Sequence, residues 1–291
     1  MKVLVTGGKG QLGSDLNAIL RTVDGVEVHA PGSTELDITD SLSITAAFRQ
    51  FAPDVVINAA AYTAVDAAET EEEAAYRVNA AGPALLATAA ARSGTRLIHV
   101  STDYVFAGDA SAPYEVDAPT APRSAYGRTK LAGEQAVREL LPALGYVVRT
   151  AWVYGASGSN FVKTMARLEK ERETVSVVDD QRGSPTWSAD LAIGLAELAR
   201  SDAPAGIYHA TGGGEVSWYG FARAIFEELG ADPDRVLPTT TEAFPRPAPR
   251  PTYSVLSNAG WVAAGLSPLA PWREALASAM EAIRAAEALG A

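Results

Sequence analysis

The sequence predicts an α/β fold, a Rossmann-like doubly wound parallel sheet followed by a smaller C-terminal lobe. Over residues 1–150, short runs of Val, Ile and Leu alternate with longer alanine-rich segments, a pattern typical of strands joined by crossover helices. A glycine-rich turn follows the first run. After residue 150 the alternation is lost and prolines and glycines cluster instead, which predicts a less regular second lobe.

The first half is expected to contain five strands and four helices. The predicted strands are short, apolar and bounded by Gly, Asp or Pro, as strands buried on both faces are, and they cover residues 3–6, 26–30, 55–58, 97–101 and 146–149. The predicted helices cover residues 11–21, 41–51, 71–92 and 125–141. The second of these helices has a cap signal at Asp40 or Ser41 and a stop signal at Pro53.

Composition excludes several classes of protein. With no cysteine, the chain holds no disulfide framework, no cysteine nucleophile and no cysteine-ligated metal, and its three scattered histidines, His29, His99 and His209, argue against a histidine-rich metal site. The 24 Lys and Arg against 35 Asp and Glu give a net charge of −11. An acidic chain without clustered cations does not predict binding to nucleic acid or to an anionic membrane surface, so its partners are expected to be small molecules or proteins.

The sequence shows no targeting or membrane-spanning segment. Met1 leads directly into a strand-like run rather than into a signal-peptide pattern. The longest uncharged, mainly apolar stretch, residues 80–91, is far shorter than the roughly 20 residues that a membrane span requires. We therefore expect a soluble, cytoplasmic protein.

Glycines stand at positions 7, 10 and 13, directly after the first predicted strand and before the first helix. A dinucleotide pyrophosphate needs residues without a Cβ at this turn, so that the backbone approaches it and the helix N-terminal amides face its charge. This context predicts a dinucleotide site. Glu35 or Asp37, after the second strand, is expected either to reach the adenosine or to cap the following helix.

Tyr126 and Lys130 lie four residues apart on a predicted helix and therefore share one face. A neighbouring ammonium group is expected to lower the pKa of the tyrosine from about 10 towards neutrality, which suits an acid–base group. Thr102 ends the fourth predicted strand and would add a hydroxyl for orienting a carbonyl group. A Tyr-x-x-x-Lys pair alone is common, but this order after a glycine-rich turn is specific.

In chain order, these motifs resemble the extended short-chain dehydrogenase/reductase family and, within it, the reductases of dTDP-4-keto-6-deoxysugars. The resemblance covers nearly the full chain. It rests on GQLG at 10–13, LDITD at 36–40, NAAAYTAVD at 58–66, STDYVF at 101–106, RTAWVYG at 149–155, NFV at 160–162, DQRGSPT at 180–186 and RP at 250–251.

The resemblance implies NAD(P)H-dependent reduction of a 4-keto group, most closely that of dTDP-4-dehydrorhamnose to dTDP-L-rhamnose. Tyr126 would donate the proton, Lys130 would assist it and bind the nicotinamide ribose, and Thr102 would orient the carbonyl. The residues expected to line the dinucleotide are Gly7, Gly10, Gln11, Leu12, Gly13, Asp37, Ile38, Ala60, Ala61, Tyr62, Tyr126 and Lys130. Those expected at the sugar nucleotide are Thr102, Asp103, Tyr126 and Trp152, with Arg182 and Arg250 as clamps for its diphosphate or base.

The same resemblance divides the chain into a dinucleotide-binding domain, residues 1–150, and a mainly substrate-binding lobe, residues 151–291, with some segments expected to return to the first domain. A basic residue that would select NADP is missing near Ser33, so NADPH and NADH both stay open, with NADPH slightly favoured. Relatives that hold Mg²⁺ between subunits use acidic ligands. Only Asp15 suggests one here and Ser188 stands where an acid would help, so no metal site is predicted. A homodimer is compatible with the sequence.

Alternative functions are also considered, and Tyr104 argues against one of them, dehydration. Related ketoreductases of antibiotic deoxysugars, including those that form dihydrostreptose, share these motifs, and so does a non-catalytic NADP-binding regulatory subunit. Nucleotide-sugar dehydratases usually place Glu where this chain has Tyr104, and epimerases hold NAD tightly. The proline-rich segment 245–251 carries two arginines and predicts a stiff loop; composition alone does not decide between a surface connection and a ligand-facing loop.

Overall fold

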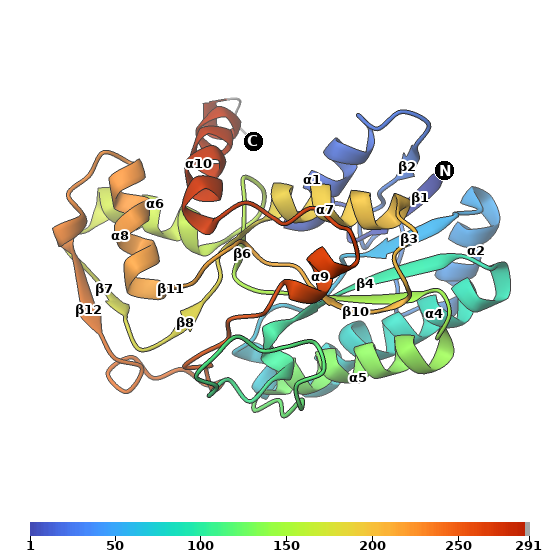
Figure 1. The fold of residues 1–291 in the computed structure, drawn as a ribbon, viewed down its shortest axis with the longest axis horizontal. Coiled ribbons are helices and arrows are strands. Elements are labelled where there is room, and N and C mark those ends of the chain that lie inside the picture. Colours follow the sequence, from blue (N-terminus) through green and yellow to red (C-terminus); the bar gives the residue numbers. More distant parts are fainter. Residues whose placement is uncertain (289–291) are drawn as a thin grey trace.

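The computed structural model describes residues 1–288 and is built around one six-stranded parallel sheet (Figure 1). The strands lie in the order β2, β1, β3, β4, β5, β10, and every neighbouring pair is parallel. Their bounds are β1 (Lys2–Thr6), β2 (Glu27–His29), β3 (Val55–Asn58), β4 (Arg96–Thr102), β5 (Gly145–Thr150) and β10 (Gly206–His209). The chain leaves β1 on one side for β2 and returns on the other side with β3. In open α/β sheets, ligands bind outside the carboxyl ends of the strands at such a reversal, which here lies at β1 and β3.

Helices cover both faces of the sheet (Figure 1). One layer contains α1 (Gln11–Leu20) and α7 (Ser188–Arg200), and the other contains α2 (Ser41–Phe51), α4 (Gly82–Ser93) and α5 (Ala125–Leu140). Alternating strand residues divide between the layers: Val3 and Val5 pack with the first, and Leu4 packs with the second. All three are fully buried. The uninterrupted apolar runs of the sequence therefore follow from burial on two faces.

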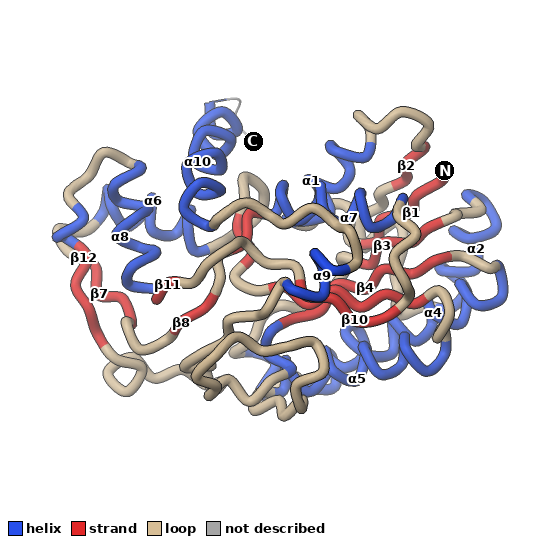
Figure 2. Tube along the Cα trace, viewed as in Figure 1, coloured by secondary structure: helices blue, strands red, loops and turns tan. Residues whose placement is uncertain are grey.

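A smaller lobe lies beside the sheet and has its own core (Figure 2). Its helices are α6 (Phe161–Glu171), α8 (Trp218–Glu228) and α10 (Trp272–Ala288), around buried Phe221, Phe226 and Leu276. Its short strand pairs are β7 (Val175–Val178) with β12 (Val236–Thr239), β8 (Arg182–Gly183) with β11 (Val216–Ser217), and β6 (Val153–Tyr154) with β9 (Thr186–Trp187). The last three residues of the predicted second lobe lie outside the described part of the chain.

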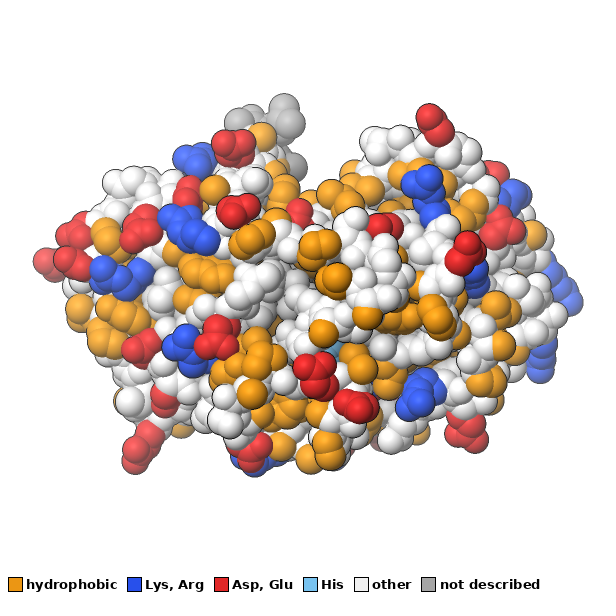
Figure 3. Space-filling view, in the orientation of Figure 1, with side chains coloured by type: hydrophobic (Ala, Val, Ile, Leu, Met, Phe, Trp, Pro, Cys, Tyr) orange, Lys and Arg blue, Asp and Glu red, His pale blue; other side chains and the backbone are white. Residues whose placement is uncertain are grey.

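Short helices complete the chain: η1 (Ala67–Glu69), α3 (Glu72–Tyr76), η2 (Arg77–Ala81), η3 (Asp103–Val105), η4 (Pro233–Arg235) and α9 (Ala259–Ala263). No helix within residues 1–288 is both long and apolar enough to cross a membrane. Charged side chains of both signs are intermixed over the face seen in Figure 3.

The fold class is confirmed, as are the bounds of α2 and β3, and Asp40 is the residue that caps α2, by accepting from the Leu42 amide at 2.9 Å. The helix predicted over residues 71–92 is present as a continuous helical stretch over residues 72–93, but it is not regular throughout. Its middle is a π-turn, η2, which separates α3 from α4. The extra residue of such a turn redirects side chains, and here it buries Asn79. The sixth strand, β10, lay outside the predicted set and comes from the second half of the chain.

A buried ion pair joins α5 to the sheet. The Arg149 guanidinium on β5 donates to both carboxylate oxygens of Glu134 on α5, at 2.7–3.2 Å, and both side chains are 2% exposed. Ser101 on β4 donates to the same carboxylate at 2.6 Å. A charge left without its partner at this depth is strongly destabilising.

We therefore expect Glu134→Ala to lower the free energy of unfolding by about 3–5 kcal/mol, because Arg149 is left buried and unpaired. Arg128→Ala on the same helix is the matched control, since its pair with Glu72 is about half exposed and is expected to contribute less than about 1 kcal/mol. Chemical denaturation followed by circular dichroism measures both. Equal losses for the two variants would contradict the assignment.

Candidate active site

Glycines form the turn at the carboxyl ends of β1 and β3. Gly7 has φ +69, and a Cβ there would lie 2.8 Å from the backbone of Ala60. A Cβ on Gly13 would lie 2.1 Å from the Gly7 carbonyl oxygen, and one on Gly8 would lie 2.2 Å from the Ala30 carbonyl oxygen. The turn thus packs directly on the ends of β2 and β3. The sequence argument missed Gly8, because its constraint is the tertiary contact with Ala30.

Gly10 lies at the N-cap of α1, and no side chain among the described residues caps this end. A Cβ on Gly10 would meet only the Gly7 oxygen, at 3.2 Å, so the surroundings of Gly10 itself are open. Free helix amides behind a close-packed glycine turn bind phosphate groups. The residues present therefore fit a dinucleotide, with its pyrophosphate at the start of α1.

The loop after β2 holds the residues expected near the adenosine. Glu35 accepts from the Gly32 amide at 2.8 Å and pairs with Lys9 of the glycine turn at 3.1 Å. These two contacts lower the pKa of the Glu35 carboxyl. Asp37 is exposed and accepts from the amide and hydroxyl of Thr39, whereas Ile38 is buried. Sequence analysis did not include Lys9, a cation that the turn places at the end of β2.

The loop after β3 is held by two buried amides. Asn58 accepts from the hydroxyl of Thr6 at 2.6 Å and from the amide of Ala60 at 3.2 Å. Asn79, in the π-turn, accepts from the Tyr62 amide and donates to the Tyr62 carbonyl, at 2.8 and 3.1 Å. Ala60, Ala61 and Tyr62 therefore have a fixed path beside the glycine turn. Sequence analysis assigned no role to Asn79, because a π-turn leaves no simple periodic signal.

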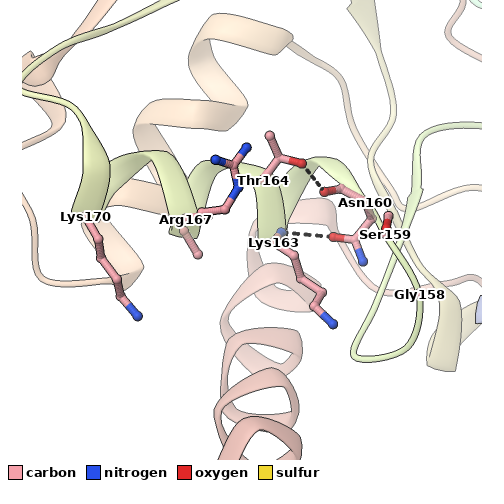
Figure 4. A pocket seen from close by; sticks show the side chains of 8 residues that line it. Gly158, Ser159, Asn160, Lys163, Thr164, Arg167 and Lys170 are labelled. Carbon is pink, nitrogen blue, oxygen red and sulfur yellow. Dashed lines mark hydrogen bonds between the residues drawn. The ribbon is translucent and has the colours of Figure 1, made fainter.

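A cationic pocket of about 420 Å³ lies at the first turns of α6 (Figure 4), and its Gly158 lies near Gln11 at the start of α1. It is lined by Gly158, Ser159, Asn160, Lys163, Thr164, Ala166, Arg167 and Lys170. Asn160 caps α6 by accepting from the Lys163 amide, and its own amide donates to the Gln11 side chain at 3.0 Å. Gln11 thereby connects the glycine turn to the second lobe.

Thr102, Tyr126 and Lys130 are brought together where β4 meets the first turns of α5. Thr102 is 5% exposed, and its hydroxyl lies near the Tyr126 phenol. Lys130 is 2% exposed, and its ammonium donates to the Val100 carbonyl at 2.7 Å. Burial lowers the pKa of Lys130 to about 8, against a smaller opposing effect of Glu134.

The expected lowering of the Tyr126 pKa is wrong for this structure. Burial raises the pKa of the phenol above its ordinary value, and nearby Asp103 and Tyr104 add to the rise. The contact with Thr102 lowers it by less. The Lys130 ammonium engages the strand backbone, so the phenol stays protonated over the physiological pH range.

Asp103 is a second buried acid at this position, 3% exposed. It accepts from Thr102 at 2.9 Å through Oδ1, while no hydrogen-bond partner for its Oδ2 is found in the described chain. Burial raises the pKa of its carboxyl to about 6, although the neighbouring Ser254 and Thr102 hydroxyls favour the charged form. A buried oxygen without a partner is the kind of group that a ligand hydroxyl satisfies.

Trp152, at the start of the second lobe, has a strained backbone with φ +48. Its ring stacks on Trp218, with centroids 3.5 Å apart and an interplanar angle of 6°. A Cβ on Gly183 would lie 2.4 Å from the Trp152 indole, so only glycine leaves room for it. Strained backbone of this kind is found at ligand sites and requires firm support from its surroundings.

The two predicted arginine clamps occupy different environments. Arg182, on β8, is about half exposed and pairs with Glu215 at 3.1 Å. The Arg250 side chain is 19% exposed, pairs with Asp66 at 2.8 Å and donates to the Tyr104 hydroxyl at 3.2 Å. Arg250 thus lies beside the Thr102–Tyr126 group, whereas Arg182 lies on the second lobe.

Asp15 is not part of a cluster of metal-ligating side chains in the described chain. Its carboxylate accepts a hydrogen bond from Ser188, and burial raises the pKa of Asp15. Within residues 1–288, no group of three or more His, Cys, Asp or Glu side chains is arranged to hold a metal ion.

Comparison with known proteins places this site in a family. The family model of the RmlD substrate binding domain matches residues 1–285. A dTDP-4-dehydrorhamnose reductase of Streptomyces griseus is 52% identical over 96% of this chain and 93% of its own length. A probable dTDP-4,6-dihydroxy-2-methyloxan-3-one 4-ketoreductase of Streptomyces antibioticus is 50% identical over 99% and 97%.

The crystal structure of dTDP-4-dehydrorhamnose reductase from Bacillus anthracis in complex with NADP has a TM-score of 0.91. It is 39% identical in sequence, over 96% of this chain and 98% of that one. The family model, the relatives and the fold agree over nearly the whole chain, and the chain therefore belongs to the RmlD family of dTDP-4-dehydrorhamnose reductases and related dTDP-sugar ketoreductases.

Proposed function

We propose that this protein is an NAD(P)H-dependent oxidoreductase that reduces the 4-keto group of a dTDP-4-keto-6-deoxysugar, with dTDP-4-dehydrorhamnose as the first candidate and dTDP-L-rhamnose as its product. The observation that carries the proposal is the Thr102–Tyr126 contact beside buried Lys130, at the sheet edge that also holds the glycine turn. Family membership supports the substrate class. A cytoplasmic location and a homodimeric state stay predictions.

The proposed chemistry needs one hydride and one proton. A reduced nicotinamide supplies the hydride to carbon 4 when it is bound. Tyr126 holds the proton at its phenol oxygen and donates it to the keto oxygen, which completes the alcohol. Thr102 orients that oxygen by a hydrogen bond, and the positive charge of Lys130 stabilises the tyrosinate that remains.

The cofactor is proposed to be NADPH or NADH, with NADPH slightly favoured. Gly7, Gly10 and Gly13 form the cradle for the pyrophosphate, and the Bacillus anthracis relative contains NADP. Lys9 supplies a cation at the end of β2, but Glu35 already pairs with it. An adenosine 2′-phosphate would compete with Glu35 for Lys9, which is consistent with a modest preference.

The substrate is proposed to lie between Thr102 and the second lobe. Asp103, with its unpartnered Oδ2, and Trp152, held against Trp218, are suited to contact the sugar. Arg182 and Arg250 supply positive charge for the diphosphate or base. Residues 1–150 then carry the dinucleotide and most of the catalytic group, and the later residues mainly carry the sugar nucleotide.

A related ketoreductase that acts on another dTDP-4-keto sugar is the second candidate, since the Streptomyces antibioticus relative carries such a name. The decisive experiment supplies dTDP-4-dehydrorhamnose, prepared in situ, with NADPH and with NADH in separate reactions, and identifies the sugar formed. Oxidation of either nicotinamide with formation of dTDP-L-rhamnose supports the proposal. Cofactor binding without turnover would favour a regulatory protein.

Tyr126→Phe is expected to lower kcat by about 10²- to 10⁴-fold, because the proton donor is lost. NADPH binding, measured by fluorescence titration, should be retained. Tyr76→Phe is a control, since Tyr76 is 51% exposed whereas Tyr126 is buried. An unchanged kcat in Tyr126→Phe would reject the assigned proton donor.

Gly13→Ala is expected to weaken NADPH binding by at least about tenfold, because the new Cβ would meet the Gly7 carbonyl at 2.1 Å and displace the cradle. Gly206→Ala is the matched control, since a Cβ there has no neighbour within 4 Å and its φ is ordinary. Dissociation constants from fluorescence titration and melting temperatures separate lost binding from lost folding. Equal NADPH affinity in both variants would contradict the cradle.

The pH dependence follows from Lys130, whose pKa burial lowers to about 8. Below that pH the side chain is charged and stabilises a tyrosinate; above it the charge is lost. We expect kcat/KM, which reports groups of the free enzyme, to fall as pH rises through about 8. Tyr126 does not set this limb, because its own pKa is raised. A flat profile from pH 7 to 10 would contradict this role of Lys130.

A further inference from the structure

The second half of the proline-rich segment and the residues after it contact the loop that follows β4. We call residues 248–254 the strap. The strap amides of Thr252 and Tyr253 donate to the Gly108 carbonyl at 2.8 and 3.0 Å. A Cβ on Gly108, which has φ +77, would lie 2.6 Å from the Pro251 side chain. The strap is therefore in close backbone contact with the loop that follows Thr102.

Asp66 fastens the strap from the opposite side. It lies in the loop after β3, and its Oδ1 pairs with Arg250 at 2.8 Å and accepts from the Ala248 amide at 3.2 Å. Ala248 is 1% exposed. Asp66 thus binds both a side chain and the backbone of the strap, and these contacts join the β3 loop to a segment about 180 residues later in the chain.

The contact continues from Arg250 to the catalytic group. The Arg250 guanidinium donates to the Tyr104 hydroxyl at 3.2 Å, and the Tyr104 ring meets the Tyr126 ring edge to face, with centroids 5.4 Å apart. At the other end of the strap, Ser254 is 2% exposed and faces Asp103. The strap therefore contacts two residues that directly follow Thr102.

We propose that Asp66 is a positioning residue for the reaction: through Arg250 it fixes the strap and the Tyr104 ring, and so holds the wall against which Tyr126 meets the keto sugar. This inference rests on the proposed reductase function. Asp66 itself needs no contact with the reacting atoms. Small displacements of a proton donor are costly, since misplacement by about 1 Å can lower a rate about 10²-fold.

The first test is Asp66→Asn, which keeps the shape of the side chain and removes the charge that holds Arg250. We expect kcat to fall about 10-fold or more and KM for the keto sugar to rise. The dissociation constant for NADPH, measured by fluorescence, should be unchanged, because the strap contacts the sugar side of the site. Arg246→Ala is the matched control. Arg246 also faces Asp66, but at 3.9 Å and with its side chain 50% exposed, and it is expected to behave as the wild type.

The second test is a double-mutant cycle. If Asp66 acts through Arg250, adding Asp66→Asn to Arg250→Ala lowers kcat no further. Asp66→Glu should partly restore kcat, and melting temperatures should show that every variant is folded. Wild-type kcat and KM in folded Asp66→Asn, or losses that multiply in the double variant, would overturn the inference. A wild-type protein that does not reduce the keto sugar would instead reject the proposed function, and the positioning role with it.

Discussion

The buried pair between Glu134 and Arg149 is the interaction on which the geometry of the site depends. Glu134 lies about two helical turns after Tyr126 and one after Lys130, so fixing it fixes the face of α5 that carries both. The same carboxylate accepts from Ser101, the residue before Thr102. The Glu134 carboxylate thus sets the distance between α5, which carries Tyr126 and Lys130, and the end of β4, which carries the Thr102 hydroxyl. Burying the two charges costs desolvation free energy. The hydrogen bonds that the carboxylate accepts from Arg149 and Ser101 offset this cost.

Most strands of the sheet could be predicted from the sequence, because buried parallel strands are uninterrupted apolar runs. Such runs can be recognised without knowing which strands lie next to them. The sequence also located the glycine turn, Thr102, Tyr126 and Lys130, whose signals are local. What it missed depends on tertiary contact: Gly8 against Ala30, the π-turn that buries Asn79, and a sixth strand from the second half. The same limit explains the Tyr126 pKa, since spacing predicts a neighbouring cation but not the burial around the phenol.

Several cationic side chains near the site are paired with acidic neighbours. The chain carries a net charge of −11, yet the proposed cofactor and substrate are both anionic. Three of the cations near the proposed ligands pair with acidic side chains: Lys9 with Glu35, Arg182 with Glu215 and Arg250 with Asp66. Such pairs orient long side chains that would otherwise be mobile, at the expense of part of their attraction for a ligand. Selectivity among anions is then set by geometry more than by net attraction.

The proposed sugar side of the site is arranged before any ligand arrives. Trp152 keeps a left-handed backbone conformation that costs of order 1–3 kcal/mol, and the stacking of Trp218 and the absence of a side chain on Gly183 hold it there. Asp103 is buried with one oxygen unsatisfied, another unfavourable arrangement in the free protein. Stability is lost at both residues, and a sugar hydroxyl at Oδ2 would recover part of it. An analogue without that hydroxyl would leave Oδ2 without a donor while Thr102 still donates to Oδ1, so this position is expected to favour a hydroxylated ligand.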